Sequence, residues 1–196
     1  MKRKTTQIAI MVMIFAVTAI AFQSCKSKKD AAKAPEDEVL VEVYCSGPEY
    51  FSNNEYFRAN QVGESSDMAV SKKKALSNAK ADLAGFISTK LKAVFDNYVK
   101  DVELNNTAEL EERYEGLSRE VVNQELQGIK VMCEKVTKTT KGTYKTYMAI
   151  ELSGEEILSN MNNRLSKDAK LKIDYDYEKF KNTFDEEMDK MENESR

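Results

Sequence analysis

The chain has 196 residues, with 30 basic and 33 acidic side chains, no histidine and a formal net charge of −3. Without histidine it has no Ser-His-Asp or Cys-His nucleophilic centre and no zinc site built on imidazole. No P-loop, GxGxxG or CxxC motif occurs, so the commonest nucleotide-binding and thiol-redox signatures are missing.

The N-terminal residues follow the pattern of an export signal. Met1 to Lys4 carries three basic side chains, and Ile8 to Phe22 is apolar except for Thr18. This run of 15 residues is shorter than the roughly 20 needed to cross the hydrocarbon core of a membrane. We therefore predict a signal peptide over residues 1–24, cut after Ser24; the alternative is an uncleaved anchor helix.

The letters AFQSC at the end of that run resemble the lipobox of bacterial lipoproteins, in which a small residue, here Ser24, precedes an obligatory cysteine, Cys25. Phe22 stands where most lipoboxes have leucine. The resemblance implies that Cys25 receives a diacylglycerol thioether and becomes the acylated first residue of the mature chain. Two or more acyl chains would hold it firmly, since one chain binds only marginally. Lys26 replaces the aspartate that retains lipoproteins in the inner membrane, which favours the outer membrane.

Loss of residues 1–24 would leave 27 basic and 33 acidic side chains, a net charge of −6. This balance argues against nucleic acid as a partner, because phosphate binding needs clustered Lys and Arg. Residues 25–38 comprise the lipidated cysteine and a charged, Ala-rich stretch interrupted by Pro35. It lacks large apolar residues, so we expect a flexible tether.

Two strands should follow the tether. Alternate residues from Val39 to Cys45 would share one apolar face, and Gly47-Pro48 would end that strand. The stretch EYFRANQVGES is a second candidate, closed by Gly63.

A long helix is the strongest local signal. Ser65 or Ser66 would cap it, with Asp67 in its first turn. Its apolar residues recur every three or four positions and form one stripe: Leu76, Ala79, Leu83, Ile87, Leu91, Val94, Tyr98 and Val102. A helix over 67–104 would be about 57 Å long, so its far end should project beyond a small sheet or kink.

Asn105-Asn106 would end that helix, and a second amphipathic helix would fold back on it as a hairpin over about 67–127. The apolar positions of the second helix are Leu110, Tyr114, Leu117 and Val121.

Two further strands are predicted around a turn at Gly142. Ile129, Val131 and Cys133 would share one face of the first, and Met148, Ile150 and Leu152 one face of the second. Ser153 and Glu156 would then form a capping box for a helix to about Leu165.

Residues 166–196 should form an acidic C-terminal helix with Leu171, Tyr175 and Phe180 as its apolar residues. Its last dozen residues are expected to fray. The predicted fold is therefore α+β: an antiparallel sheet of about four strands covered on one face by a long helix, with a helical hairpin and C-terminal helices. The α+β domain would span 39–165.

The segment YFRANQVGESSDMAVSKKKALSNAKADLAGFIS is similar to the core of the LPP-twenty family of small outer-membrane lipoproteins. The likeness rests on a strand with Arg58 and Gly63, then a capped helix with Ala69, Ala75, Ala79 and Leu83 facing inward. It covers roughly Val39 to Leu165, although the helical hairpin is longer than expected for the family. The resemblance implies a non-enzymatic domain attached to the outer membrane and transfers no catalytic residues.

Cys45 and Cys133 remain after Cys25 is lipidated. Both fall on apolar faces of predicted strands, in a compartment that permits oxidation. A disulfide between them is one interpretation, and two buried, reduced cysteines are the other.

Five aromatic residues gather around the first turn: Tyr44, Tyr50, Phe51, Tyr56 and Phe57. They would either form an exposed loop that recognises protein or glycan, or cover the open end of the sheet.

Catalytic or metal-binding carboxylates are not expected. Glu111-Glu112 and Glu186-Glu187 are predicted to lie on solvated helical faces. The acidic run DEEMDKMENE lacks the glycine and ligand spacing of a calcium loop. We therefore expect no cofactor, and a structural or interaction domain with an envelope protein partner or self-association. The alternative is an envelope binding module for a small molecule, lipid or glycan, and an enzyme comes third.

Overall fold

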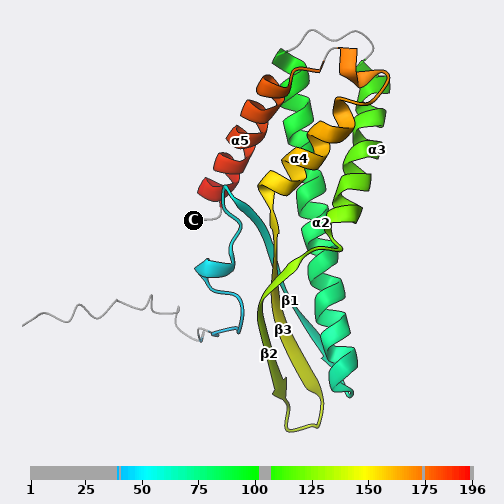
Figure 1. The fold of residues 1–196 in the computed structure, drawn as a ribbon. Helices are drawn as coiled ribbons and strands as arrows, with labels where there is room; N and C mark the ends of the chain where they lie inside the picture. The colour runs from blue at the N-terminus through cyan, green and yellow to red at the C-terminus, as the bar shows by residue number, and fades with distance from the viewer. Residues whose placement is uncertain (1–38, 40, 102–106, 174, 195–196) are drawn as a thin grey trace, which may run out of the picture. The chain divides into compact units, whose positions relative to one another are not determined.

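The computed structural model describes residues 39, 41–101, 107–173 and 175–194 (Figure 1). The chain divides between Glu42 and Val43, and the architecture below is that of residues 43–196. It contains three strands, four α-helices and two 3-10 turns in the described part. In chain order these are η1 (Pro48–Tyr50), β1 (Tyr56–Ser65), α2 (Met68–Asp101), α3 (Thr107–Glu125), β2 (Lys130–Lys138), β3 (Tyr144–Ser153), α4 (Gly154–Leu165), η2 (Leu171–Ile173) and α5 (Tyr177–Glu194).

The fold class α+β with an antiparallel sheet is confirmed, but the sheet has three strands in the order β1-β3-β2. The strand predicted from Val39 to Cys45 is wrong: its described residues, 39 and 41–45, have no strand structure, and Cys45 lies in a turn. Cys45 has φ of +58°, a left-handed conformation that an extended strand cannot contain. Alternating valines therefore do not place this segment in the sheet.

Helix α2 begins with a side-chain cap from Asp67, whose Oδ1 accepts a hydrogen bond from Val70 N at 2.9 Å. The predicted cap at Ser65 or Ser66 is thus displaced by one or two residues. Ser65 instead accepts a bond from Asp67 N through its Oγ. The tight turn brings α2 directly back across β1.

Gly63 allows α2 to approach the sheet closely. A Cβ at this position would lie 2.4 Å from both Ser71 O and Ala75 N, so any other residue would push the helix away. The close contact is reinforced by Ser71 Oγ, which donates to Gly63 O at 3.0 Å and shares a 2.7 Å hydrogen bond with Thr146 Oγ1.

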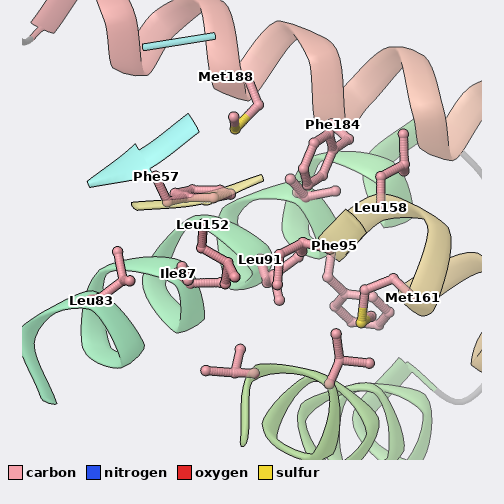
Figure 2. Packing of buried hydrophobic residues seen from close by; sticks show 14 of the residues in the cluster. Phe57, Leu83, Ile87, Leu91, Phe95, Leu152, Leu158, Met161, Phe184 and Met188 are labelled. Carbon is pink, nitrogen blue, oxygen red and sulfur yellow. The ribbon is translucent and has the colours of Figure 1, made fainter. Parts of the chain in front are cut away.

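The predicted stripe of α2 forms the core. Ala79, Leu83, Ile87, Leu91, Val94 and Tyr98 are buried, while Leu76 is half-buried and Val102 lies outside the described residues. Helix α2 contacts β1 and β3, and also contacts α3 and α5 further along. Figure 2 shows the labelled side chains of β1, β3, α4 and α5 pointing toward this stripe.

The predicted helical hairpin partner is α3. Leu110, Tyr114 and Val121 are buried on it and Leu117 is half-buried, while the predicted break at Asn105-Asn106 lies outside the described residues.

The β3 prediction is confirmed, since Met148, Ile150 and Leu152 are all buried. On β2, a bulge separates Val131, which pairs with Ile150, from Cys133, which pairs with Ala149. Because neighbouring residues of β3 point to opposite faces, the predicted shared face of Val131 and Cys133 is wrong.

The predicted fraying of the last dozen residues is wrong for those that the structure describes, up to Glu194. Helix α5 continues to Glu194, and Met188 and Met191 are 3% and 1% exposed. These methionines stand among acidic residues, so the sequence window looks solvated although one stripe of it is apolar. At the start of α4, Ser153 Oγ accepts from Glu156 N as predicted.

Candidate functional site: the strapped face of the sheet

Residues 43–55, which we call the strap, pack on the face of the sheet that is turned away from α2, which we call the outer face. Side chains alternate along β3, so Tyr147, Ala149 and Glu151 point away from the face of Met148 and Ile150. Ala149 is completely buried, and the strap reaches this face on both sides of it, through the Cys45–Cys133 disulfide and the contact of the Tyr44 ring with Tyr147. The strap therefore supplies the cover.

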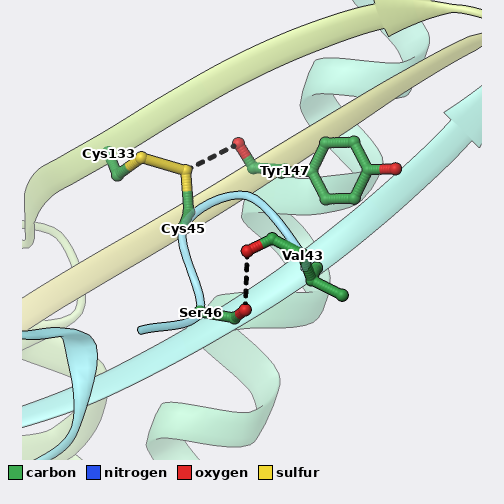
Figure 3. The surroundings of a disulfide bond; sticks show 5 residues. All are labelled: Val43, Cys45, Ser46, Cys133 and Tyr147. Carbon is green, nitrogen blue, oxygen red and sulfur yellow. Dashed lines mark hydrogen bonds between the residues drawn. A yellow bond between two sulfur atoms is a disulfide. The ribbon is translucent and has the colours of Figure 1, made fainter. Parts of the chain in front are cut away.

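The disulfide in Figure 3 joins Cys45 of the strap to Cys133 of β2, with Cα atoms 5.6 Å apart across 88 residues of sequence. Nearby, Ser46 Oγ donates to Val43 O at 2.8 Å, and the Tyr44 ring packs edge-on against Tyr147. Cys45 Sγ lies 3.6 Å from Tyr147 O. A disulfide sulfur carries no hydrogen, so this is a contact rather than a hydrogen bond.

The left-handed backbone of Cys45 costs a non-glycine residue of order 1–3 kcal/mol. Burial of its side chain and the covalent link to β2 hold it in this conformation. The turn at Cys45 thus directs the strap back over the outer face.

An ion cluster of two nearly buried side chains and one exposed lysine lies beside the strap. Glu151 Oε2 is 3.1 Å from Arg58 Nε and Glu151 Oε1 is 2.7 Å from Lys130 Nζ. The Arg58 and Glu151 side chains are 13% and 7% exposed. Burial would raise the pKa of Glu151, but hydrogen bonds from Lys130 and Arg58 outweigh it and hold that pKa below its usual value.

Arg58 also fastens the strap to β1. Its Nη1 donates to Phe51 O at 2.9 Å, and its backbone N donates to Ser52 Oγ at 2.8 Å. Ser52 Oγ in turn donates a hydrogen bond to Arg58 O at 3.2 Å. Through these bonds the cluster holds the strap against β1, while the Lys130 side chain stays 75% exposed.

An open hollow of about 420 Å³ borders this cluster at the edge of β1 that faces away from β3. It is lined by Tyr50, Phe51, Ser52, Arg58, Ala59, Asn60, Asp82 and Phe86. Phe51 is 42% exposed there, whereas Phe57, on the same strand as Arg58, is buried against Phe86 on the other face. The structure therefore leaves Phe51 of the aromatic segment exposed and buries Phe57.

A second, apolar space lies among the helices. It is lined by Phe95, Tyr98, Leu110, Tyr114, Leu165, Leu171, Tyr175 and Phe180, and its volume is about 20 Å³, room for a single water. The Phe95 and Tyr114 rings stack at 4.4 Å across it, and burial raises the pKa of Tyr114 far above its usual value. This space is part of a packed core.

The remaining predicted residues are distributed as follows. Ser24 and Cys25 lie outside the described residues. Ala75, Ala79 and Leu83 face inward as the family resemblance implies, but Ala69 is exposed.

Glu187 is not on a solvated face: it is 7% exposed and accepts from Asn97 at 2.9 Å and Lys190 at 2.6 Å. Within the described residues, no cluster of three or more acidic or cysteine side chains is placed to hold a metal ion.

Sequence reasoning missed the Arg58–Glu151–Lys130 cluster. One signal was available, because Glu151 interrupts the apolar run MAIEL of a buried strand, and a buried acid needs a partner. The partners themselves come from two other strands, and only the register brings them together.

No family model, curated protein or solved structure matches this chain. The similarity to the LPP-twenty family therefore stays a prediction. None of the described helices has both the length and the apolar character needed to span a membrane.

Proposed function

We propose that this protein is an outer-membrane lipoprotein whose folded part is a non-enzymatic structural or protein-interaction domain of the cell envelope. The observation that carries the proposal is the AFQSC motif, in which Ser24 precedes Cys25 directly after a short apolar run. Lys26 in the following position supports the outer membrane as the destination.

The strap supports the same compartment. Cys45 and Cys133 meet at disulfide distance, and such bonds persist in oxidising, extracytoplasmic spaces. The disulfide also fastens the chain to the sheet only 20 residues after Cys25, so tension on the anchor would be transferred to β2 through a covalent bond.

The anchor is tested by metabolic labelling of the full chain with a palmitate analogue. We expect label on the wild-type protein and on Cys45→Ser/Cys133→Ser, which keeps Cys25, and none on Cys25→Ser. We expect Cys25→Ser to leave the membrane fraction. Label retained on Cys25→Ser, or absent from the wild type, would refute the lipoprotein proposal.

The interaction role is tested by crosslinking intact cells at native abundance and identifying the products by mass. Recovery of the monomer alone would contradict it.

The alternative is an envelope binding module for a small molecule, lipid or glycan. The observation that favours it is the hollow beside Phe51, which combines exposed aromatic surface with the Arg58 cluster. Purified protein should then show a higher melting temperature with envelope lipids or glycans, and Phe51→Ala should abolish the shift. Val70→Ala is a matched control, because Val70 is equally exposed, at 42%, but does not line the hollow.

A further inference from the structure

The two edge strands of the sheet, β1 and β2, differ in whether their outward backbone groups have hydrogen-bond partners. In an antiparallel ladder, alternate residues turn their N–H and C=O groups toward the partner strand and away from it. Gly154 N donates to Glu55 O, so the odd-numbered residues of β1 bond to β3 and the even-numbered ones, Tyr56 to Glu64, point outward.

Four side chains cover this outward edge of β1. Asn53 and Ser52 bond to the backbone of Tyr56 and Arg58, and Asn78 and Lys74 donate to Val62 O and Glu64 O. An edge capped in this way offers little room for another strand.

The edge of β2 is open. Thr139 N donates to Thr143 O, which assigns the odd-numbered residues of β2 to β3 and turns the backbone of Glu134, Val136 and Lys138 outward. Throughout the described chain, no group outside the sheet bonds to these outward backbone groups. Val136 is 40% exposed on the same edge.

Among the described residues, neither α2 nor the strap hydrogen-bonds to the outward backbone of this edge. Helix α2 packs over β1 and β3, and the strap reaches β2 through Cys133, which points to the outer face beside Ala149. Glu134 points to the α2 face, where its carboxylate lies 2.7 Å from Lys72 Nζ.

We propose that the open edge of β2 pairs with β2 of a second copy of this chain, antiparallel and across a two-fold axis at Val136. Only outward residues can exchange hydrogen bonds, so Glu134, Val136 and Lys138 must face residues of the same set. With the axis at Val136, Glu134 of each copy lies opposite Lys138 of the other, on the same face of the joined sheet.

The other registers lack this complementarity. An axis at Glu134 places two glutamates opposite each other, and an axis at Lys138 places two lysines opposite each other, both of which are unfavourable. Axes at Lys135 or Thr137 set a charged residue against Val136. Charge complementarity and the alternation of outward backbone groups therefore select the register with the axis at Val136.

The strands and α2 leave room for this arrangement. Adjacent strands lie about 4.8 Å apart, so the two β3 strands would be about 14 Å apart and the two α2 helices, over β1 and β3, farther still. The β-bulge beyond Cys133 ends the pairing after a short segment. The contact is small, and the inference rests on the proposed membrane anchor, which concentrates the copies on one surface.

Lysines on an edge strand are also the usual means of preventing such pairing. β2 carries Lys130, Lys135 and Lys138. Exchanging charges distinguishes the two roles of Lys138. If Lys138 only prevents pairing, the double exchange of Glu134 and Lys138 should not restore a dimer. If Lys138 pairs with Glu134 of the other copy, the double exchange should restore the dimer that each single change reduces.

The test uses Val136→Cys in the full-length protein in its own envelope, read on non-reducing gels. Cα atoms of a hydrogen-bonded pair lie about 5.5 Å apart, within the disulfide range. We expect a product at twice the monomer mass, reversible by reductant. Val62→Cys, 42% exposed on the capped edge, is the matched control and should stay monomeric.

In the Val136→Cys background, Glu134→Lys and Lys138→Glu should each reduce the dimer to the level of the Val62→Cys control, and the double exchange should restore it. Failure of Val136→Cys to exceed the control, a product of any other mass, or no rescue by the double exchange would overturn the proposal. If palmitate labelling succeeds and the crosslink fails, the dimer alone is refuted. If the crosslink forms on an unlabelled chain, the anchor alone is refuted.

Discussion

Replacement of Gly63 by alanine tests how the sheet and α2 are held together. The new Cβ would lie 2.4 Å from Ser71 O and from Ala75 N, where ordinary contacts begin at 3.4 Å. Both atoms belong to the backbone of a long helix, so neither can move alone, and α2 must retreat by about 1 Å.

The cost has two parts. Overpacking of this kind typically costs about 1–3 kcal/mol. The retreat also lengthens the bonds from Ser71 Oγ to Gly63 O and to Thr146 Oγ1, each worth about 1 kcal/mol. We therefore expect Gly63→Ala to lower the free energy of unfolding by about 3–4 kcal/mol, and the melting temperature by about 10 °C.

The assay is thermal or urea unfolding followed by circular dichroism. Gly85→Ala is the matched control, because it lies within α2 and no heavy atom comes within 4 Å of its added Cβ. Since alanine is the better helix former, Gly85→Ala should gain about 0.5–1 kcal/mol. A loss below about 1 kcal/mol for Gly63→Ala would refute the close-approach argument.

Three further outcomes are expected. Titration of the denatured, unreduced protein should find no free thiol at Cys45 or Cys133, and two titratable thiols would contradict the disulfide. Replacing both cysteines by alanine should lower the free energy of unfolding by about 3–4 kcal/mol in thermal unfolding, because the disulfide closes a loop of 88 residues. The hydrogen bond from Arg113 lowers the pKa of Asp168 from 3.8 to about 2. The ionised Asp168 therefore stabilises the fold by about 1–2 kcal/mol at neutral pH, and this stabilisation is lost as the pH falls from about 4 through 2. Acid unfolding of Asp168→Asn should lack that step, and an unchanged acid profile would exclude the ion pair as its source. Met191→Ala should cost about 2–4 kcal/mol in urea unfolding, whereas a frayed helix end would lose almost nothing.

The helices illustrate what local pattern can predict. The stripe from Ala79 to Tyr98 repeats every three or four residues over several turns, and a signal of that length leaves only the cap uncertain. Asp67 caps the helix because its carboxylate reaches Val70 N, a choice among three neighbouring polar residues that depends on the turn geometry after β1.

The errors occurred where the environment, not the pattern, decided the structure. The valines before Cys45 alternate as a strand requires, yet the described residues among them have no strand structure, and the chain turns at Tyr44 and Cys45. The acids of α5 suggested a solvated end, but α5 packs on α2 and α4 and buries Met188, Met191 and even Glu187.

For the candidate site, the sequence contained the two cysteines and the aromatic residues but not their arrangement. Cys45 meets Cys133 because the strap crosses the outer face, and Arg58, Glu151 and Lys130 meet because the register aligns three strands. The difference between the capped edge of β1 and the open edge of β2 likewise depends on side chains from the strap and from α2.

By itself, the sequence determined the periodic elements and the α+β class, and it predicted the lipid anchor, because these depend on neighbours within a few residues. Only the tertiary structure decided the number of strands, the place of the strap, the burial of α5 and which sheet edge stays open. Those features depend on contacts between residues tens of positions apart, and no local pattern carries that information.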